Sequence, residues 1–248
     1  MDLLAGASGY SFKEWCGSFY PEKLAATKML AYYATQLPVV EINNTFYQQP
    51  KPALLESWRQ QVPPTFRFVV KASRRITHIK RLGNAESETK YLLDTLQGLG
   101  DQLAAILFQM PPYMRLDVPR LEAFLKLLPP GTPAAFEFRH PSWNDETVLA
   151  ALSAHGCALC ASDTDEGDEP MLARTAPYIY LRLRRESYGD DALRRWLERL
   201  RAGGWERAYV FFKHEDGAVG PRLAQRFLEM AGVRVGSDTT LTPGGHDA

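Results

Sequence analysis

The sequence predicts an α/β protein folded as a (β/α)8 barrel, in which helices surround a closed parallel sheet. Eight short apolar runs recur along the 248 residues with helix-like stretches between them, and eight such repeats in about 250 residues are typical of this barrel. Each run leads into polar or charged residues. Because these barrels build their sites at the C-terminal ends of the strands, we expect the polar ends to form the functional site.

The eight predicted strands share this pattern of an apolar run with a polar end. In chain order they are Leu3–Ala7, Val39–Tyr47, Arg67–Ala72, Leu103–Met110, Pro133–Phe138, Cys157–Asp163, Tyr178–Leu183 and Arg207–His214. The length and the 45% hydrophobic content suit one barrel domain over residues 1–235 better than two smaller domains. Residues 236–248 are polar and rich in Gly, so we expect a flexible tail there.

The connecting segments show helical spacing of their apolar residues. The clearest three have the stripes Leu121, Phe124, Leu125 and Leu128; Leu193, Trp196, Leu197 and Leu200; and Leu223, Ala224, Phe227, Leu228 and Ala231. Asp190 is expected to cap the second helix, and Pro221 to lie in the first turn of the third. The acidic stretch Asp163–Glu169 leaves little room for a helix, so we expect a short or irregular sixth connection.

Composition limits the partners and the compartment. Lys plus Arg and Asp plus Glu are equal at 29 each, so the whole chain offers no electrostatic case for nucleic acid or membrane, although a local basic mouth fits the same totals. No apolar run is long enough to span a membrane, and no secretion signal is evident, so a cytoplasmic location is expected. Cys157 and Cys160 lie three apart in a predicted strand, where side chains alternate, so they should face opposite ways rather than form a redox pair.

Strand alternation also sorts the polar residues by face. Val40 and Ile42 share one parity, and since helices cover the outside, Glu41 and Asn43 should point into the barrel. The same rule places further polar residues inside. They are Lys71, Gln109, Glu137, Arg139 and Lys213.

Buried charges cost several kcal/mol each unless they are paired, so this cluster must be mutually neutralised or must receive a ligand. Glu41 and Lys71 lie on neighbouring strands and are expected to pair, in which case Lys71→Met would lower stability. Ion pairs that merely fill the barrel are one interpretation. The other, which we favour, is a site in which Glu41, Lys71 and Glu137 are the catalytic candidates, as general acid and base or as an amine nucleophile. A glycosidase pair of Glu41 and Glu137 is disfavoured because the second and fifth strands lie far apart.

No metal or other cofactor is expected. Glu41, Glu137, His140 and Asp163 are available as ligands, but the neighbouring Lys and Arg side chains would repel a divalent cation. His78 and His140 are expected either to serve the site or to tie their loops together. His155 should end a helix, and His246 falls in the tail.

Two further groups of side chains are candidates for ligand contacts. The loop SGYSFKEWCGSFYP, with Tyr10 and Trp15, would cap or stack on a planar ligand, or else form a hydrophobic plug. A basic set would receive phosphates, or else form an ordinary solvated surface. It comprises Arg74, Arg75, Lys80, Arg81, Arg182, Arg184 and Arg185.

At these residues the chain resembles the DUF72 (YecE-like) family, whose function is unknown. The matching segments are GASGYSFKEWCGSFYP, VEINNTFYQQP, FRFVVKASRRITHIKRL, LAAILFQMPP, FEFRHPSW and, more weakly, YVFFKHEDGAVGPRLAQRFLEM. The resemblance implies a (β/α)8 barrel and no established reaction. It also implies that certain motif positions line the mouth, namely Glu41, Asn43, Lys71, Glu137, Arg139 and Trp143.

The chain departs from the family pattern at two strand ends. Where the family's seventh strand usually ends like Arg-Phe-His-Gly, this chain has Arg182-Leu183-Arg184-Arg185, and where the eighth usually ends like Phe-Asn-Asn it has Phe212-Lys213-His214. Both changes tend to add positive charge. Any activity that depends on the missing histidine or asparagines is not expected here.

The expected function is recognition of a small anionic or phosphorylated ligand at the barrel mouth. Arg139, Arg182 and Lys213 would hold the anion and Glu41 or Glu137 would move a proton, as in a metal-independent hydrolase, lyase or isomerase. The expected ligand-binding residues are Tyr10, Trp15, Asn43, Arg74, Gln109, Arg139, His140, Trp143, Arg182 and Lys213. Nucleic-acid binding or processing, and a non-catalytic scaffold or regulatory binder, are the alternatives. The sequence leaves the oligomeric state open.

Overall fold

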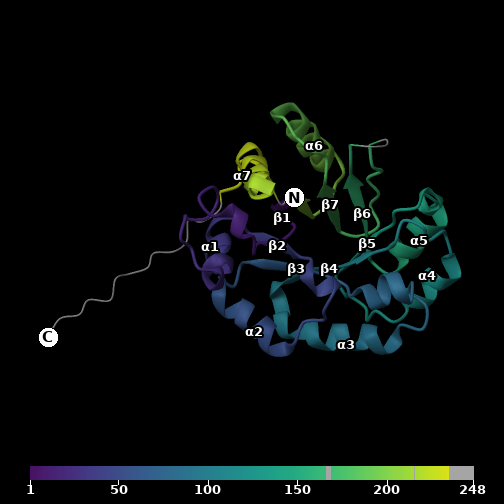
Figure 1. Ribbon diagram of the computed structural model, residues 1–248. Coiled ribbons are helices and arrows are strands. Elements are labelled where there is room, and N and C mark those ends of the chain that lie inside the picture. Colours follow the sequence, from purple (N-terminus) through teal and green to yellow (C-terminus); the bar gives the residue numbers. More distant parts are fainter. Residues whose placement is uncertain (166–168, 215, 235–248) are drawn as a thin grey trace.

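The computed structural model describes residues 1–165, 169–214 and 216–234. Within them, eight parallel strands form the nearly closed barrel that the sequence predicts, and helices surround it (Figure 1). The strands are β1 (Asp2–Ala7), β2 (Val39–Ile42), β3 (Arg67–Lys71), β4 (Leu103–Gln109), β5 (Ala134–Glu137), β6 (Ala158–Asp163), β7 (Tyr178–Leu183) and β8 (Arg207–Phe212). The predicted tail, with His246, lies outside the described residues.

Seven α-helices of the described residues follow the strands. They are α1 (Met29–Gln36), α2 (Pro52–Gln61), α3 (Glu86–Leu96), α4 (Val118–Leu125), α5 (Glu146–Ala154), α6 (Asp190–Ala202) and α7 (Val219–Ala231). Short 3-10 segments cover Lys13–Trp15, Ala26–Lys28, Asn44–Phe46, Gln97–Gln102, Pro141–Trp143 and Asp216–Ala218, and a π-helical turn covers Arg75–Ile79. Between β6 and β7, residues 164–165 and 169–177 contain no helix, as expected for the sixth connection.

Several boundaries differ from the expected ones. The predicted second strand ends at Ile42 rather than at Tyr47, because Asn44–Phe46 turns into a 3-10 helix in which Phe46 N–H bonds the carbonyl of Asn43. Asp190 is not the cap of α6. Gly189 occupies that position, and Asp190 lies in the first turn, where its carboxylate pairs with Arg226 of α7 at 2.6 Å.

The ladder of hydrogen-bonded strands runs from β1 through β8 and back to β2, so β1 and β2 are its two ends. A tyrosine of α1 joins them: the Tyr33 hydroxyl accepts a hydrogen bond from Ala7 N–H at 2.8 Å and donates one to the Val39 carbonyl at 3.0 Å. Gly6 makes room for this approach, because a Cβ atom there would lie 2.0 Å from the Val39 oxygen. The barrel is therefore completed by a side chain at this seam.

Two apolar clusters confirm the inward and outward assignment. Val40, Ile42 and Phe68 belong to the larger cluster between sheet and helices, whereas Val39 and Val69 belong to the smaller cluster inside the barrel. The parity that puts Val39 and Val69 inside also puts Glu41 and Lys71 inside.

The two cysteines near β6, Cys157 and Cys160, follow the same rule. Cys157 lies in the outer cluster and Cys160 in the inner one, and both are free thiols. The expectation that they face opposite ways is confirmed.

Candidate functional site

A buried guanidinium links two buried carboxylates near the C-terminal end of the barrel. Arg182, near the end of β7, places Nη2 at 2.9 Å from Oε1 of Glu41 on β2 and Nη1 at 2.7 Å from Oε2 of Glu137 on β5. The exposed fractions of the three side chains are 2%, 0% and 1%. The planar fork of arginine suits this arrangement, since it can donate to two carboxylates at once.

Neutral polar groups complete the network. Tyr180 donates its hydroxyl proton to Glu41 Oε2 at 2.5 Å, and Asn43 donates to Glu41 Oε1 at 3.0 Å. Gln109 donates to Glu137 Oε2 at 2.8 Å. The structure therefore brings Glu41, Asn43, Gln109, Glu137 and Arg182 together, all of them residues predicted for the site.

These contacts keep both carboxylates ionised. Burial alone raises the pKa of Glu41, but the Arg182 charge and the hydrogen bond from Tyr180 outweigh it, and the pKa falls to about 2. The Ser8 side chain acts in the same direction. Burial is opposed in the same way at Glu137, where Arg182 and then Arg184 lower the pKa. A carboxylate with so low a pKa is a poor proton donor and acceptor at neutral pH.

The shared guanidinium also corrects the expected spacing of the two carboxylates. Glu41 and Glu137 were expected to lie far apart because their strands are far apart, yet both lie within hydrogen-bond distance of Arg182. The short distance between the two carboxylates nevertheless does not support a glycosidase site. Such a site needs one carboxylic acid with a raised pKa, whereas both pKa values here are lowered.

Lys71 is not the partner of Glu41, so the expected pairing is wrong. Among the described residues no carboxylate oxygen lies within 4.0 Å of Lys71 Nζ, which sits 4.3 Å from the centre of the Phe46 ring. Arg182 occupies the position beside Glu41 instead, because it reaches that carboxylate across the barrel interior. Burial and the charge of Arg182 lower the pKa of Lys71 to about 8, despite the opposing effect of Glu41.

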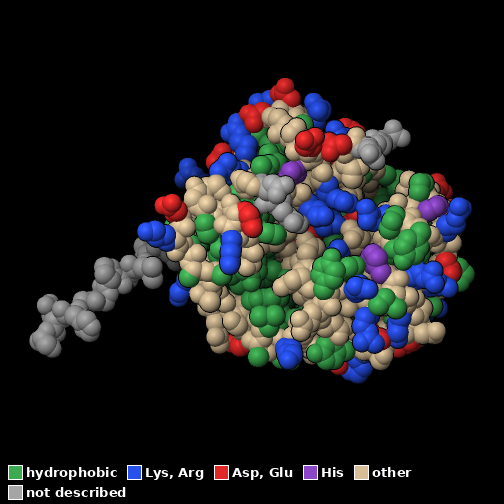
Figure 2. Space-filling view, viewed as in Figure 1, with side chains coloured by type: hydrophobic (Ala, Val, Ile, Leu, Met, Phe, Trp, Pro, Cys, Tyr) green, Lys and Arg blue, Asp and Glu red, His purple; other side chains and the backbone are tan. Residues whose placement is uncertain are grey.

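Cations border the mouth beyond the buried network. Arg139 and Lys213 are exposed just past the ends of β5 and β8, and Arg184 is half-buried with Nη1 at 3.5 Å from Glu137 Oε1. Lys213 contributes to the lowered pKa of Lys71, and Arg139 to that of Arg184, so these charges act on one another. Figure 2 shows Lys and Arg side chains gathered near the centre of the face it presents.

A third buried carboxylate lies beside the mouth. Asp163, at the end of β6, accepts from Arg185 Nε at 2.8 Å and from the Tyr188 hydroxyl at 3.0 Å. The same departure from the family pattern that supplies Arg184 therefore also supplies the partner of Asp163.

Other predicted site residues lie elsewhere. Trp15 is 1% exposed and packs among Phe12, Phe19 and Tyr20, so its ring is not available for stacking on a ligand. The carbonyl of Tyr10 accepts from Tyr20. The first loop thus has the packing expected of a hydrophobic plug.

The motif after β5 also has structural contacts. His140 Nδ1 accepts from Ser142 N–H at 3.1 Å at the start of a 3-10 turn. Trp143 stacks on Phe138 at 4.2 Å and donates its indole N–H to the Met114 carbonyl at 2.7 Å. These contacts hold the loop, as the alternative for His140 anticipated.

Two more residues of the third repeat lie near Lys71. Arg74 is exposed, and His78 is half-buried, with the centre of its ring 4.8 Å from the centre of the Phe46 ring. Burial lowers the pKa of His78, and Lys71, Arg139 and Arg74 lower it further. His78 therefore belongs to the cationic side of the mouth.

Sequence reasoning missed Tyr180, Ser8 and the role of Arg184. Tyr180 shares the parity of Arg182 on β7, and Ser8 follows β1 with the parity of Leu4. Extending the alternation rule to these two residues would have placed them inside. Arg184 was predicted as a member of the basic set that would receive phosphates and as a departure from the family pattern, but not as a partner of Glu137.

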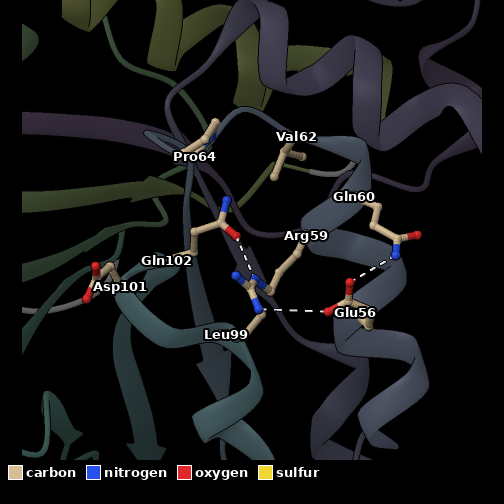
Figure 3. A pocket seen from close by; sticks show the side chains of 8 residues that line it. All are labelled: Glu56, Arg59, Gln60, Val62, Pro64, Leu99, Asp101 and Gln102. Atoms are coloured by element: carbon tan, nitrogen blue, oxygen red, sulfur yellow. Dashed lines mark hydrogen bonds and ion pairs between the residues drawn. The ribbon is translucent and has the colours of Figure 1, made fainter.

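The described residues show no arrangement of three or more His, Cys, Asp or Glu side chains that could hold a metal ion. None of their helices has the length and apolar character needed to span a membrane. A hollow of about 360 Å³ lies at the opposite end of the barrel, next to the segments that precede β3 and β4 (Figure 3). Its polar side chains bond one another, as Arg59 does Gln102 at 3.3 Å, so we assign the site to the mouth.

Comparison with known proteins agrees with this fold. The family model described as "Protein of unknown function DUF72" matches residues 4–245. UPF0759 protein YunF of Bacillus subtilis is 29% identical over 173 residues, which are 63% of this chain and 61% of that protein. UPF0759 protein YecE of Escherichia coli K12 is 30% identical over 133 residues, 51% of this chain and 49% of that protein. The chain therefore spans about half to three fifths of these curated relatives.

Solved structures show the same barrel. A crystal structure of a DUF72 family protein from Thermotoga maritima has a TM-score of 0.81 at 26% identity and covers 94% of this chain and 100% of that one. One from Enterococcus faecalis has a TM-score of 0.80 at 19% identity and covers 99% and 100%, which supports the fold alone. With its family model matched over nearly its whole length, the chain belongs to the DUF72 family of proteins of unknown function.

Proposed function

We propose that the mouth of this barrel binds a small anionic ligand, such as a phosphorylated metabolite. The observation that carries the proposal is the charge balance there. In the described part of the chain, Arg182 neutralises Glu41 and Glu137 only in part, but Lys71, Arg139 and Arg184 add further positive charge around them. An anion would balance this excess and gain charge-assisted hydrogen bonds.

The roles expected from the sequence change in two respects. Arg182 was expected to hold the anion, but its two terminal nitrogens donate to Glu41 and Glu137. It therefore positions these carboxylates rather than contacting the ligand. Arg139, Arg184 and Lys213 are the better direct contacts. Glu41 and Glu137 were expected to move a proton, and their low pKa values leave that role to Lys71.

A neutral part of the ligand also has a candidate contact. Asn43 Oδ1 is buried and accepts no hydrogen bond from the described residues, although its Nδ2 donates to Glu41. A hydroxyl group on the ligand would satisfy this oxygen. The three thiols are unpaired, which fits the proposed cytoplasmic location.

Titration calorimetry with phosphate, sulfate and a phosphosugar tests the proposal, with and without a chelator. We expect binding that survives the chelator and weakens roughly 10-fold or more in Arg139→Gln, since a charge-assisted hydrogen bond contributes about 1.5–3 kcal/mol. Arg195→Gln is the matched control, because Arg195 is exposed on α6, outside the barrel.

Loss of binding with chelator would indicate a metal site instead. Absence of binding by all three anions, with Arg139→Gln behaving as wild type, would leave ion pairs that fill the barrel as the better account.

One observation favours single-stranded nucleic acid as a second candidate. Tyr47 is 74% exposed and contacts Phe46, on the side of the mouth where Arg74 is also exposed. Exposed aromatic rings beside cations suit base stacking and phosphate contacts. The equal totals of positive and negative residues weigh against it. Salt-dependent binding of a labelled oligonucleotide, weakened in Tyr47→Ala, would support this candidate over a small anion.

A further inference from the structure

We propose that Lys71 is a nucleophile that forms an imine with the carbonyl group of an anionic aldehyde or ketone at the barrel mouth. This inference rests on the proposed function, because the cations of the mouth would hold the anionic end of the same compound. It assigns to Lys71 a covalent role that anion binding alone does not require.

The position of Lys71 is well defined. It is the last residue of β3, and its side chain has the inward parity of Val69. Its carbonyl accepts a hydrogen bond from the Thr45 hydroxyl at 2.7 Å, and the next residue, Ala72, donates its N–H to the Leu107 carbonyl at 2.9 Å. The backbone on both sides of the amine is therefore fixed.

The surroundings of the amine increase the fraction of it that is neutral and reactive. In the described residues no carboxylate oxygen is within 4.0 Å of its Nζ, which lies 4.3 Å from the centre of the Phe46 ring. Partial burial and the charge of Arg182 outweigh the opposing effects of Glu41 and Glu137, and the pKa is lowered to about 8. A desolvated lysine next to other cations is a recurrent form of amine nucleophile in enzymes.

The other buried nucleophiles of the interior are less suitable. Burial raises the pKa of the Cys160 thiol well above its usual value, and Glu137 raises it further. Tyr180 is held by Glu41, and burial raises its pKa as well. Among the described side chains at this end of the barrel, Lys71 is therefore the one best suited to act as a nucleophile.

The step balances without any co-reactant. The neutral amine attacks the carbonyl carbon and a C–N bond forms. Protons move from nitrogen to oxygen, and the C–O bond breaks to release water. Overall, the ammonium and the carbonyl compound give a protonated imine and one water molecule, with charge and hydrogen count unchanged. The anionic group, held by Arg139, Arg184 or Lys213, would keep the carbonyl at the amine.

Borohydride trapping tests the inference. The protein is incubated with pyridoxal phosphate, an anionic aldehyde, reduced with borohydride and mapped by peptide mass spectrometry. We expect Lys71 to carry at least ~10-fold more label than Lys126, since its lowered pKa of about 8 increases the neutral amine and the cations of the mouth would hold the phosphate beside it. Lys126 is the internal control because it is exposed at the end of α4.

Two comparisons show whether the site's cations matter. 5-Deoxypyridoxal has the same free aldehyde without the phosphate, and we expect it to label Lys71 at least ~10-fold more slowly. Lys71→Arg keeps the charge and removes the nucleophile, so label at this peptide should vanish while the melting curve shows a folded protein. Inorganic phosphate should protect Lys71 in the wild type.

Label spread evenly over exposed lysines, or found on Lys213 in place of Lys71, would overturn the inference. If calorimetry shows phosphate binding that Arg139→Gln weakens but Lys71 is not labelled, the imine is wrong and the proposed anion site stands. If no anion binds and 5-deoxypyridoxal labels Lys71 as fast as pyridoxal phosphate does, the proposed function is wrong, and with it the anionic substrate assigned here.

Discussion

At the scale of single residues, the barrel interior holds two cations in very different surroundings. Arg182 is 2% exposed and bonds two carboxylates, which raises its already high pKa. Lys71 is half-buried, contacts an aromatic ring and has no carboxylate within 4.0 Å in the described residues. Arg182 therefore stabilises the folded state by pairing with two buried carboxylates, whereas the charge of Lys71 opposes folding and is available for chemistry.

Lys71→Met is expected to leave the free energy of unfolding at about pH 7 unchanged or higher. If Lys71 were the partner of Glu41, the same substitution would lower the free energy of unfolding. In the wild type the Lys71 pKa falls from 10.5 to about 8 on folding, so the unfolded chain binds more protons between those values. The contribution of Lys71 to the free energy of unfolding therefore rises as pH increases through that range. Lys71→Met removes the titrating amine, so this increase should be absent in the variant.

Urea unfolding of both proteins at about pH 7 and about pH 10 measures this difference, and the comparison cancels the titration of other groups. A loss of several kcal/mol at about pH 7 would instead show that a carboxylate depends on Lys71.

At the scale of elements, the weakest point of the barrel is the seam between β1 and β2. The other seven strand pairs are joined by backbone ladders, but here α1 contributes the Tyr33 hydroxyl as the bridge. Gly6 allows the strands to approach closely. Ser8 and Glu41 lie just beyond this seam, so its geometry also positions one side of the candidate site.

Tyr33→Phe is expected to lower the free energy of unfolding by about 1–3 kcal/mol, because it leaves the buried Ala7 N–H and Val39 carbonyl without a partner. Tyr32→Phe, on the same helix, is the control, since the Tyr32 hydroxyl makes no hydrogen bond with the described residues. Urea unfolding gives both values. Equal effects of the two substitutions would show that the seam closes without this hydroxyl.

At the scale of the whole molecule, an overall charge of zero conceals an uneven distribution. Glu41, Glu137 and Asp163 are buried with arginine partners, whereas further cations gather around the mouth. Protonation of Glu41 and Glu137 should therefore be a main route of acid unfolding.

We expect wild-type stability to fall as pH decreases from about 4.5 toward 2, since the folded-state pKa values of Glu41 and Glu137 are lowered and the unfolded chain binds protons first. The loss attributable to Glu41 is on the order of 3 kcal/mol. The triple variant E41Q/E137Q/R182M removes the network, so its stability should change less with pH in this range. If the stability of both proteins falls equally with pH in this range, carboxylates outside the network account for the acid unfolding.

Local sequence patterns determined the strands and the direction of their side chains. All eight strands, the lack of a helix in the described residues between β6 and β7, the inward parity of Glu41 and Lys71 and the opposite faces of the two strand cysteines follow from them. These properties depend on a period of two along a strand and on the need to bury its apolar face, both of which are local.

Pairing across the interior was decided by tertiary structure alone. Parity indicates that a side chain points inward but not how far it reaches or what it meets, so Glu41 was matched to Lys71 on the neighbouring strand. The closed barrel instead brings Arg182 to Glu41 and Glu137 from a strand adjacent to neither. It also packs Trp15 into an aromatic cluster. Buried charges take the partner with the best hydrogen-bond geometry, and that geometry exists only after the barrel has closed.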